Sequence, residues 1–119
     1  MRPYQSVTPE IMEELKQIVG SHYASNDPDK LAGYKTDQEE NTLYHHMPEA
    51  VVYPETTEQV AAIMKLATRL RIPVTPRSGG TGLAGGAIPV CGGIVLVFDR
   101  MNKILELDPV NMFVRVQAG

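Results

Sequence analysis

The chain has 119 residues, 43% hydrophobic and 21% charged, which is ordinary for one modest globular domain. Its formal net charge of −3, with Lys and Arg scattered along the chain, gives no reason to expect nucleic acid or an anionic membrane as a partner. No apolar stretch could span a bilayer, and the charged N-terminus lacks the apolar core of a signal peptide. The lone Cys91 cannot form an internal disulfide, so we expect a cytoplasmic protein and interpret Cys91 as a buried small residue rather than a nucleophile.

Residues 8–19 carry the signals of a first helix. Thr8 is placed to cap it, Pro9 fits the first helical position and Gly20 fits the position after its end. Apolar residues recur at helical spacing and predict the face that packs on a core. These residues are Ile11, Met12, Leu15, Ile18 and Val19.

Residues 21–47 are polar and irregular. The pair Asp27 and Pro28 predicts the start of a short helical turn that Gly33 ends. A group of acidic and amide residues follows, and we interpret it as solvated surface because it lacks the loop geometry of a cation site. This group is Asp37, Glu39, Glu40 and Asn41.

The adjacent histidines His45 and His46 are a second candidate for metal binding. Neighbouring side chains on an extended chain face opposite ways, so the two would not easily hold one ion. We therefore expect a structural or surface role for them, and no metal site in this chain.

From residue 49 the pattern becomes regular. Residues 49–54 predict a strand, Thr56 and Gln59 form a capping box at a helix start, and a helix follows to about Arg71. Residues 74–76 predict a second strand, so the unit is βαβ, with parallel strands and a right-handed crossover. The predicted apolar face of the helix is Val60, Ile63, Met64, Ala67 and Leu70.

The last third of the chain predicts further strands. Residues 93–99 form a continuous apolar run, typical of a strand buried on both faces. Residues 104–108 and 113–117 alternate with period two around a turn at residues 109–112, which predicts a hairpin of half-buried strands. The fold class is α+β, with an α/β start that passes into antiparallel strands. A chain that stops in such a strand is expected to be a piece of a longer protein.

Between the second and third predicted strands lies a run rich in glycine. Five of the eleven residues from 76 to 86 are glycine. Such a loop lets backbone N–H groups point into one concavity and hold an anion such as a pyrophosphate. A flexible linker is the plain alternative, but linkers are rarely flanked by two buried strands.

Three familiar glycine loops do not fit. Residues 80–85 match G-x-G-x-x-G by letter, but the proline and three glycines of residues 86–93 will not form the helix that a Rossmann site needs. No Gly-Lys-Ser/Thr follows, as a P-loop requires. No Val-Ala-Ile-Lys strand follows, as a protein kinase requires. What remains is a long loop that holds a diphosphate without a helix dipole.

In their combined order these segments resemble the first half of the FAD-binding domain of the vanillyl-alcohol oxidase/p-cresol methylhydroxylase superfamily. The likeness is greatest to the FAD-linked oxidase branch (PCMH-type FAD-binding domain) that holds glycolate oxidase, D-lactate dehydrogenases and D-2-hydroxyglutarate dehydrogenase. The matching segments are residues 50–54, 57–60, 72–74, 76–82, 85–89, 99–104 and 116–119. The resemblance divides the chain into an N-terminal helical extension, residues 1–46, and a first FAD-binding subdomain, residues 47–119, cut at its end.

The resemblance also implies which residues contact FAD. The stretch from Arg77 to Leu83 would wrap the pyrophosphate mainly through main-chain N–H groups, and Gly85, Gly86 and Ala87 would lie close to the flavin or ribityl chain. Thr81 stands where some relatives carry a histidine bonded covalently to the flavin, so the FAD is expected to be non-covalent. The implied cofactor-binding residues are Pro76, Arg77, Ser78, Gly79, Gly80, Thr81, Gly82, Leu83, Gly85, Gly86 and Ala87.

The reaction implied by the resemblance is oxidation of a 2-hydroxy acid, of glycolate or D-lactate type, to a 2-oxo acid. The hydride goes to flavin N5 while a base takes the hydroxyl proton. The base, the carboxylate clamp and any metal would lie beyond residue 119, so we nominate no catalytic residue and expect this chain alone to be inactive and to bind FAD poorly. It could also self-associate through exposed strand edges. The alternative is a self-contained nucleotide- or phosphate-binding module without catalysis.

Overall fold

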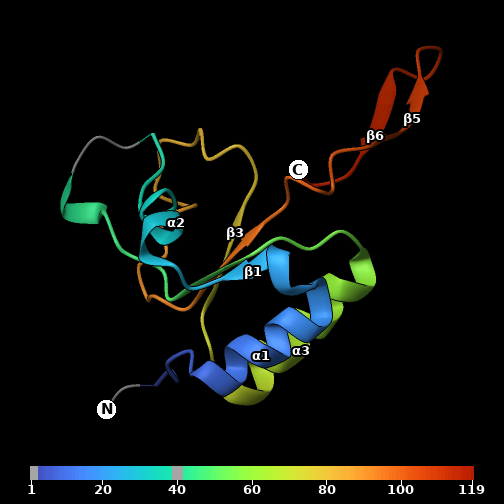
Figure 1. Ribbon diagram of the computed structural model, residues 1–119. Coiled ribbons are helices and arrows are strands. Elements are labelled where there is room, and N and C mark those ends of the chain that lie inside the picture. The colour runs from blue at the N-terminus through green and yellow to red at the C-terminus, as the bar shows by residue number, and fades with distance from the viewer. Residues whose placement is uncertain (1–2, 39–41) are drawn as a thin grey trace.

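The computed structural model describes residues 3–38 and 42–119. It shows a four-stranded sheet with two long helices packed together on one side and a separate two-stranded hairpin that projects from the body (Figure 1). The helices are α1 (Pro9–Val19), α2 (Pro28–Ala32) and α3 (Thr57–Leu70), with 3₁₀ turns at Ser21–Tyr23 and Thr42–Tyr44. The strands are β1 (Ala24–Ser25), β2 (Ala50–Val52), β3 (Val74–Arg77), β4 (Ile94–Val97), β5 (Ile104–Asp108) and β6 (Phe113–Val116).

The helix boundaries follow the capping signals. The Thr8 hydroxyl accepts a hydrogen bond from the N–H of Ile11 at 3.3 Å, and the Thr56 hydroxyl accepts one from the N–H of Gln59 at 3.2 Å. Helix α3 ends at Arg71, which adopts a left-handed conformation with φ 56°. The predicted starts of both long helices are therefore confirmed, because a side-chain oxygen satisfies an N–H group that has no partner within the helix.

The sheet has the order β1-β2-β4-β3. Strand β4 pairs in parallel with both β2 and β3, and Val95 lies opposite Val51 on one side and Thr75 on the other. The strands of the predicted βαβ unit are thus parallel, as expected, but β4 lies between them. Strand β1 pairs antiparallel to β2 at the edge; it was not predicted, because two residues carry no periodic signal.

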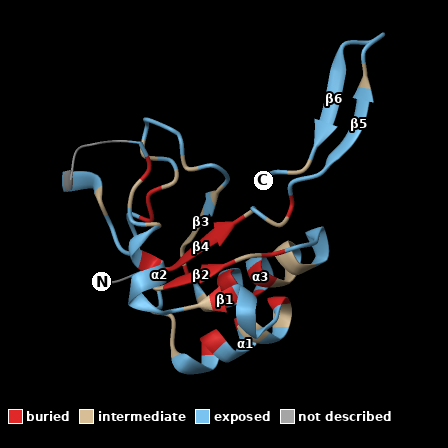
Figure 2. Cartoon of the chain, turned by 45° about the horizontal axis from the view of Figure 1, so that its top comes forward, coloured by how far each residue is buried: buried red, intermediate tan, exposed pale blue. Residues whose placement is uncertain are grey.

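Side chains of β2 and β4 alternate between two apolar layers. Ala50, Val52, Ile94 and Leu96 pack with α1 and α3. Val51, Val95 and Val97 pack on the other face, with Leu31 of α2 and with Tyr34 and Tyr53 at its margin. The predicted burial of β4 on both faces is therefore confirmed, and Figure 2 shows it as the red centre of the molecule.

The predicted face of α3 was partly wrong. Met64 is 42% exposed, whereas Leu66, which was not in the predicted set, is buried beside Ile63 and Ala67. The inward face of α3 is therefore turned slightly from the one that the spacing indicated.

The predicted division at residue 47 stays a prediction. In the structure, α1 and β1 belong to the same core as β2, β4 and α3. Arg69 of α3 also contacts Glu14 of α1 at 3.0 Å. Residues on both sides of position 47 therefore share one hydrophobic core.

The predicted hairpin is present, with β5 and β6 antiparallel and an irregularity between Ile104 and Glu106. Its predicted half-burial is wrong, because every residue of β6 is exposed and in β5 only Asp108 is even partly covered. Figure 2 shows the hairpin extending away from the buried layers. The stem is held at its base, where Gly119 donates its N–H to Met101 O at 2.8 Å.

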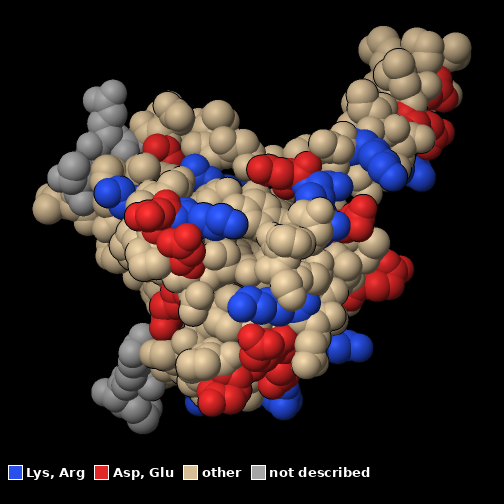
Figure 3. Space-filling view, in the orientation of Figure 1, with Lys and Arg blue, Asp and Glu red and all other residues tan. Residues whose placement is uncertain are grey.

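None of the helices in the described part of the chain is long and apolar enough to cross a membrane. Figure 3 shows one face of the molecule, on which acidic and basic side chains are interspersed rather than separated by sign.

Candidate functional site

The glycine-rich connection leaves the carboxyl end of β3 and returns to the start of β4. Residues 78–93 form this connection, which arches beside α2 above the sheet (Figure 1). Ligands of open α/β sheets bind outside the carboxyl ends of parallel strands, where loops diverge. The loop therefore lies where the topology favours a binding site.

The first half of the loop has main-chain donors to offer. Within the described part of the chain, the N–H groups of residues 78–84 donate to no acceptor of the protein. Two glycines give the loop its shape by adopting positive φ, Gly80 at 67° and Gly85 at 78°. Successive N–H groups left unpaired in a glycine-rich turn can surround an anion.

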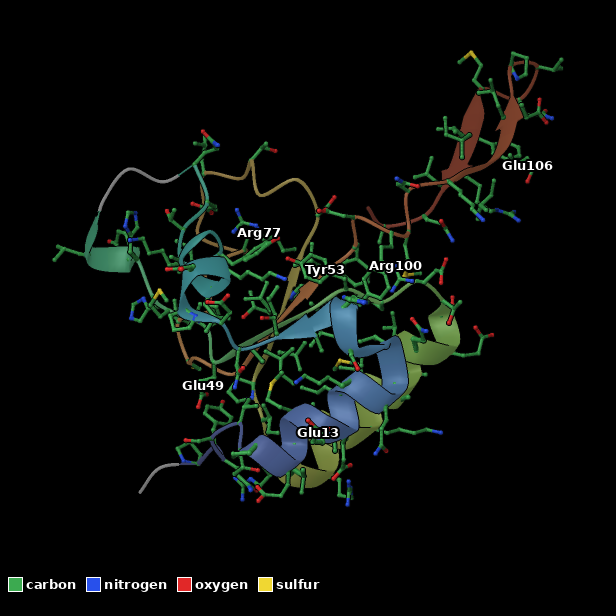
Figure 4. All side chains as sticks on the ribbon, in the orientation of Figure 1. Glu13, Glu49, Tyr53, Arg77, Arg100 and Glu106 are labelled. Atoms are coloured by element: carbon green, nitrogen blue, oxygen red, sulfur yellow. The ribbon has the colours of Figure 1, made fainter. Side chains whose placement is uncertain are left out.

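Arg77 supports the loop rather than pointing a free cation at it. Its Nη1 donates to the carbonyl oxygen of Thr36 at 2.5 Å, and its guanidinium lies 5.4 Å from the centre of the Tyr34 ring. A Cβ at Gly80 would overlap this guanidinium. Figure 4 shows Arg77 between the sheet and the α2 side of the molecule. The side chain of Arg77 therefore supports the loop, and its main chain belongs to the β3–β4 ladder, where its carbonyl oxygen accepts from the N–H of Phe98 at 3.0 Å.

Asp37 lies against the other half of the loop. Its Oδ2 accepts a hydrogen bond from the N–H of Gly85 at 3.0 Å, and the next residue, Gln38, donates its N–H to Gly82 O at 3.1 Å. Asp37 is only 9% exposed. Its assignment to a solvated surface was wrong, because the contact spans 48 positions of sequence and no local pattern indicates it. Glu39, Glu40 and Asn41, assigned with it, lie outside the described residues.

An apolar pocket opens beside the loop. Its volume is about 410 Å³ and its lining comes from three segments: the 3₁₀ turn, the second half of the glycine loop and the approach to β4. The lining residues are Tyr44, Leu83, Ala84, Gly85, Ile88 and Val90. Leu83 is 73% exposed and Tyr44 54% exposed, so the pocket presents apolar side chains to whatever enters it. Sequence reasoning did not identify Tyr44, Ile88 or Val90.

A pair of tyrosines connects α2 to the end of β2. The hydroxyls of Tyr34 and Tyr53 are 2.6 Å apart and their rings meet edge to face. Burial, and secondarily the hydrogen bond shared with Tyr34, raises the pKa of Tyr53. Arg100 donates to the carbonyl oxygen of Tyr53 at 2.9 Å, and its guanidinium lies over the Tyr23 ring. Tyr53 and Arg100 are labelled in Figure 4. Tyr53 therefore stays neutral at physiological pH, and the pair braces the sheet beneath the loop.

The structure corrects the prediction for Cys91, and the surface or structural role expected of His45 and His46 stays a prediction. Cys91, interpreted as buried, is exposed, because it lies in the turn before β4 rather than in the strand. His46 Nδ1 lies 2.9 Å from Tyr44 O, so the His46 ring contacts the last residue of the 3₁₀ turn Thr42–Tyr44. Among the described residues, no group of three His, Cys, Asp or Glu side chains is placed to hold a metal ion.

Comparison with known proteins identifies the family of the segment that contains the glycine loop. The family model described as the FAD binding domain matches residues 48–119, the segment that contains β2 to β6 and the whole loop. The chain belongs to this FAD-binding domain family. Its cofactor is therefore FAD.

The chain is similar to segments of longer proteins. It is 38% identical over 114 residues to glycolate oxidase subunit GlcD of Bacillus subtilis and 38% identical over 116 residues to a D-lactate dehydrogenase of Anaerostipes hadrus. These alignments cover 95% and 98% of this chain and 24% of each relative, so the chain spans about a quarter of their length. A solved structure of p-cresol methylhydroxylase superposes with a TM-score of 0.76 at 28% identity, over 87% of this chain and 20% of that one.

Proposed function

We propose that residues 76–87 hold the pyrophosphate and adjoining parts of a non-covalently bound FAD in an oxidoreductase that converts a 2-hydroxy acid into a 2-oxo acid. The observation that carries the cofactor site is the row of N–H groups at residues 78–84, at the carboxyl end of β3, which donate to no acceptor among the described residues. The names of the relatives, a glycolate oxidase and a D-lactate dehydrogenase, support a substrate with a hydroxyl beside a carboxylate.

The loop residues divide into three roles in this proposal. The N–H groups from Ser78 to Leu83 bind phosphate oxygens, and their charge comes from oriented backbone dipoles rather than from a basic side chain. Arg77 and Pro76 hold the start of the loop in place. Gly86 meets nothing within 4 Å of its ideal Cβ position, which leaves room for the cofactor to approach the backbone.

Bound FAD supplies the capacity to accept a hydride from the substrate carbon. The residues of this chain bind and orient that group, and the apolar side chains of the 410 Å³ pocket exclude water beside it. The chain spans about a quarter of its relatives' length, so we assign the base and the substrate carboxylate clamp to residues outside this segment and nominate no catalytic residue here. Thr81 forms no covalent bond to the flavin in this proposal.

The experiment begins with the gene product purified as its own cells make it. The absorption spectrum is recorded before and after acid precipitation, and the bound flavin is then titrated under anaerobic conditions with glycolate, D-lactate, L-lactate and D-2-hydroxyglutarate. We expect flavin bands that pass into the supernatant after acid, and bleaching by at least one of the four acids.

Two results would overturn this proposal. Flavin that stays with the precipitate would contradict non-covalent binding at Thr81. A flavin that none of the four acids reduces would contradict the substrate class. A protein that binds ADP but retains no flavin would favour the alternative, a phosphate-binding module without catalysis.

A further inference from the structure

A short segment that precedes the family match is joined to the glycine loop at three points. Arg77 donates to Thr36 O at 2.5 Å, Gln38 donates to Gly82 O at 3.1 Å, and Gly85 donates to Asp37 Oδ2 at 3.0 Å. The three bonds lie at the start, the middle and the end of the loop. Residues 36–38 thus run along the loop as a second strip of backbone, although the family model begins only at residue 48.

Among these contacts, the one made by Asp37 differs in kind. Here the segment uses its own side chain, and the partner is a glycine with φ 78°, a conformation that other residues rarely adopt. A carboxylate that accepts from a backbone N–H makes a stronger bond than a neutral acceptor does. Asp37 is also nearly buried, so water competes little for the same N–H.

The position of the carboxylate also determines where an anion can bind. The N–H of Gly85 is donated to Asp37, whereas those of residues 78–84 are unpaired within the described chain. A phosphate group near Gly85 would meet the negative charge of Asp37, and a buried like-charge contact is unfavourable. Asp37 Oδ2 also lies 4.0 Å from the ideal Cβ position of Gly82, so the start of the loop, residues 78–81, is left as the place for the pyrophosphate.

We propose that Asp37 is a positioning residue of the pyrophosphate loop: by holding the N–H of Gly85 it fixes the far end of the loop and directs the diphosphate to the N–H groups at its start, residues 78–81. The inference rests on the proposed function of the loop. It extends the binding apparatus to a residue outside the segment that the family model matches, and it makes the role of Gly85 one of loop shape rather than of phosphate contact.

The chain contains a matched control at the opposite end of the same connection. Glu49 Oε2 accepts from the N–H of Gly93 at 2.7 Å, and Gly93 also has a positive φ, 69°. Glu49 likewise holds Val7 N–H at 3.3 Å with its other oxygen. Its carboxylate has the same role toward the backbone. Glu49 directly precedes β2, and its side chain reaches the residue before β4, away from residues 78–84 (Figure 4). A purely structural effect would appear in both variants.

The test uses the purified protein stripped of flavin. FAD, ADP and riboflavin are titrated separately into wild type, Asp37→Ala, Asp37→Asn and Glu49→Ala, and hydrogen exchange is followed at the amide of Gly85. For Asp37→Ala we expect FAD and ADP to bind roughly tenfold more weakly, because a bond to a charged group is lost. Riboflavin, which has no diphosphate, should bind equally to the variant and to wild type, and Gly85 should lose protection.

Asp37→Asn keeps an oxygen acceptor of the same shape, so it should bind FAD more tightly than Asp37→Ala does. This variant keeps the test valid if Asp37→Ala fails to fold. Glu49→Ala should lower stability while leaving the affinities for FAD and ADP within about twofold. Unchanged FAD and ADP affinities in Asp37→Ala, or an equal loss in Glu49→Ala, would overturn the inference. A wild type that binds neither FAD nor ADP would instead overturn the proposed function of the loop.

Discussion

The two sets of strands in this molecule have similar compositions and opposite surroundings. Strand β4 consists of Ile, Val, Leu and Val, all buried, between two parallel neighbours and two apolar layers. The β5–β6 hairpin is also rich in branched and apolar residues, but Ile104 and Leu107 are each 71% exposed. Local sequence therefore predicts which residues form strands, whereas burial depends on whether another element covers them.

The cover of β4 comes from both sides of the sheet, and the hairpin has no equivalent. Helices α1 and α3 pack on one face of β2 and β4, and Leu31 of α2 packs on the other. The hairpin is stabilised by its own ladder and turn and by bonds at its stem, such as Gln117 N–H to Lys103 O at 2.9 Å. A two-stranded hairpin with no packed face is marginally stable in water. Its uncharged outer end is visible in Figure 3.

The largest difference between the two regions should follow removal of side-chain volume. Ile63→Ala leaves a cavity between α3 and the sheet, because Ile63 is fully buried, and should lower the free energy of unfolding by about 2–5 kcal/mol. Leu107→Ala in the hairpin should change it by less than about 0.5 kcal/mol. Urea unfolding followed by circular dichroism compares the two, and equal losses would show that the hairpin contributes to the core.

The junction between loop and sheet offers the next effect in size. Gly93 directly precedes β4 and has φ 69°, and a Cβ there would overlap the carbonyl oxygen of Pro73. Gly93→Ala should therefore cost about 2–4 kcal/mol. The matched control is Gly33→Ala, where φ is −69° and the nearest atom lies at an ordinary 3.5 Å. Thermal melts that coincide for the two variants would contradict the assigned backbone of Gly93.

A smaller effect is expected at the helix that covers the sheet. Thr56→Ala removes the hydroxyl that accepts the N–H of Gln59 and should lower stability by about 1 kcal/mol. The N–H of Glu55 would keep its bond to the Gln59 side chain at 2.7 Å, which limits the loss. A melting temperature identical to that of wild type would show that the capping box adds nothing to the cover of β4.

The smallest effect concerns the turn of the hairpin. Hydrogen bonds from the backbone and then the side chain of Asn111 lower the pKa of Asp108. A lowered pKa in the folded state stabilises the turn at pH values above the ordinary pKa, and this contribution is lost as pH falls below about 4. NMR shifts of the Asn111 amide should report loosening on acidification in wild type and none in Asp108→Asn.

The self-association expected of exposed strand edges stays a prediction, and sedimentation of Leu107→Lys against wild type would test it.

Local signals allowed most of the elements to be predicted, and what was missed depends on distant contacts. Thr8 and Thr56 cap helices through bonds three residues away, so their roles could be deduced from sequence. The insertion of β4 between β2 and β3, and the two-residue strand β1, arise only when segments far apart in the chain meet. The exposure of Cys91 follows from a turn whose length no residue pattern fixed.

The same distinction applies to the candidate site. Glycine content and the flanking strands were enough to predict a long glycine-rich loop between two strands, because backbone freedom is a local property. That this loop binds a diphosphate stays a prediction. The bond between Asp37 and Gly85 was missed because it joins positions 48 apart, and an acidic residue among other acids is usually solvated. Tyr34 and Tyr53 were missed for the same reason, since their hydroxyls meet only after α2 packs on the sheet.

The central position of β4 has a consequence for how the protein is made. Strands β2 and β3 are not neighbours in the sheet, and only β4, which is made after both of them, joins one to the other. At about 5–20 residues per second, a ribosome needs several seconds to proceed from β2 to β4. During that interval β2 and α3 can pack with α1, which precedes them, but the strand that joins β2 to β3 is still missing. The glycine loop closes only when β4 is in place, so any ligand of this loop meets a chain whose four-stranded sheet is already complete.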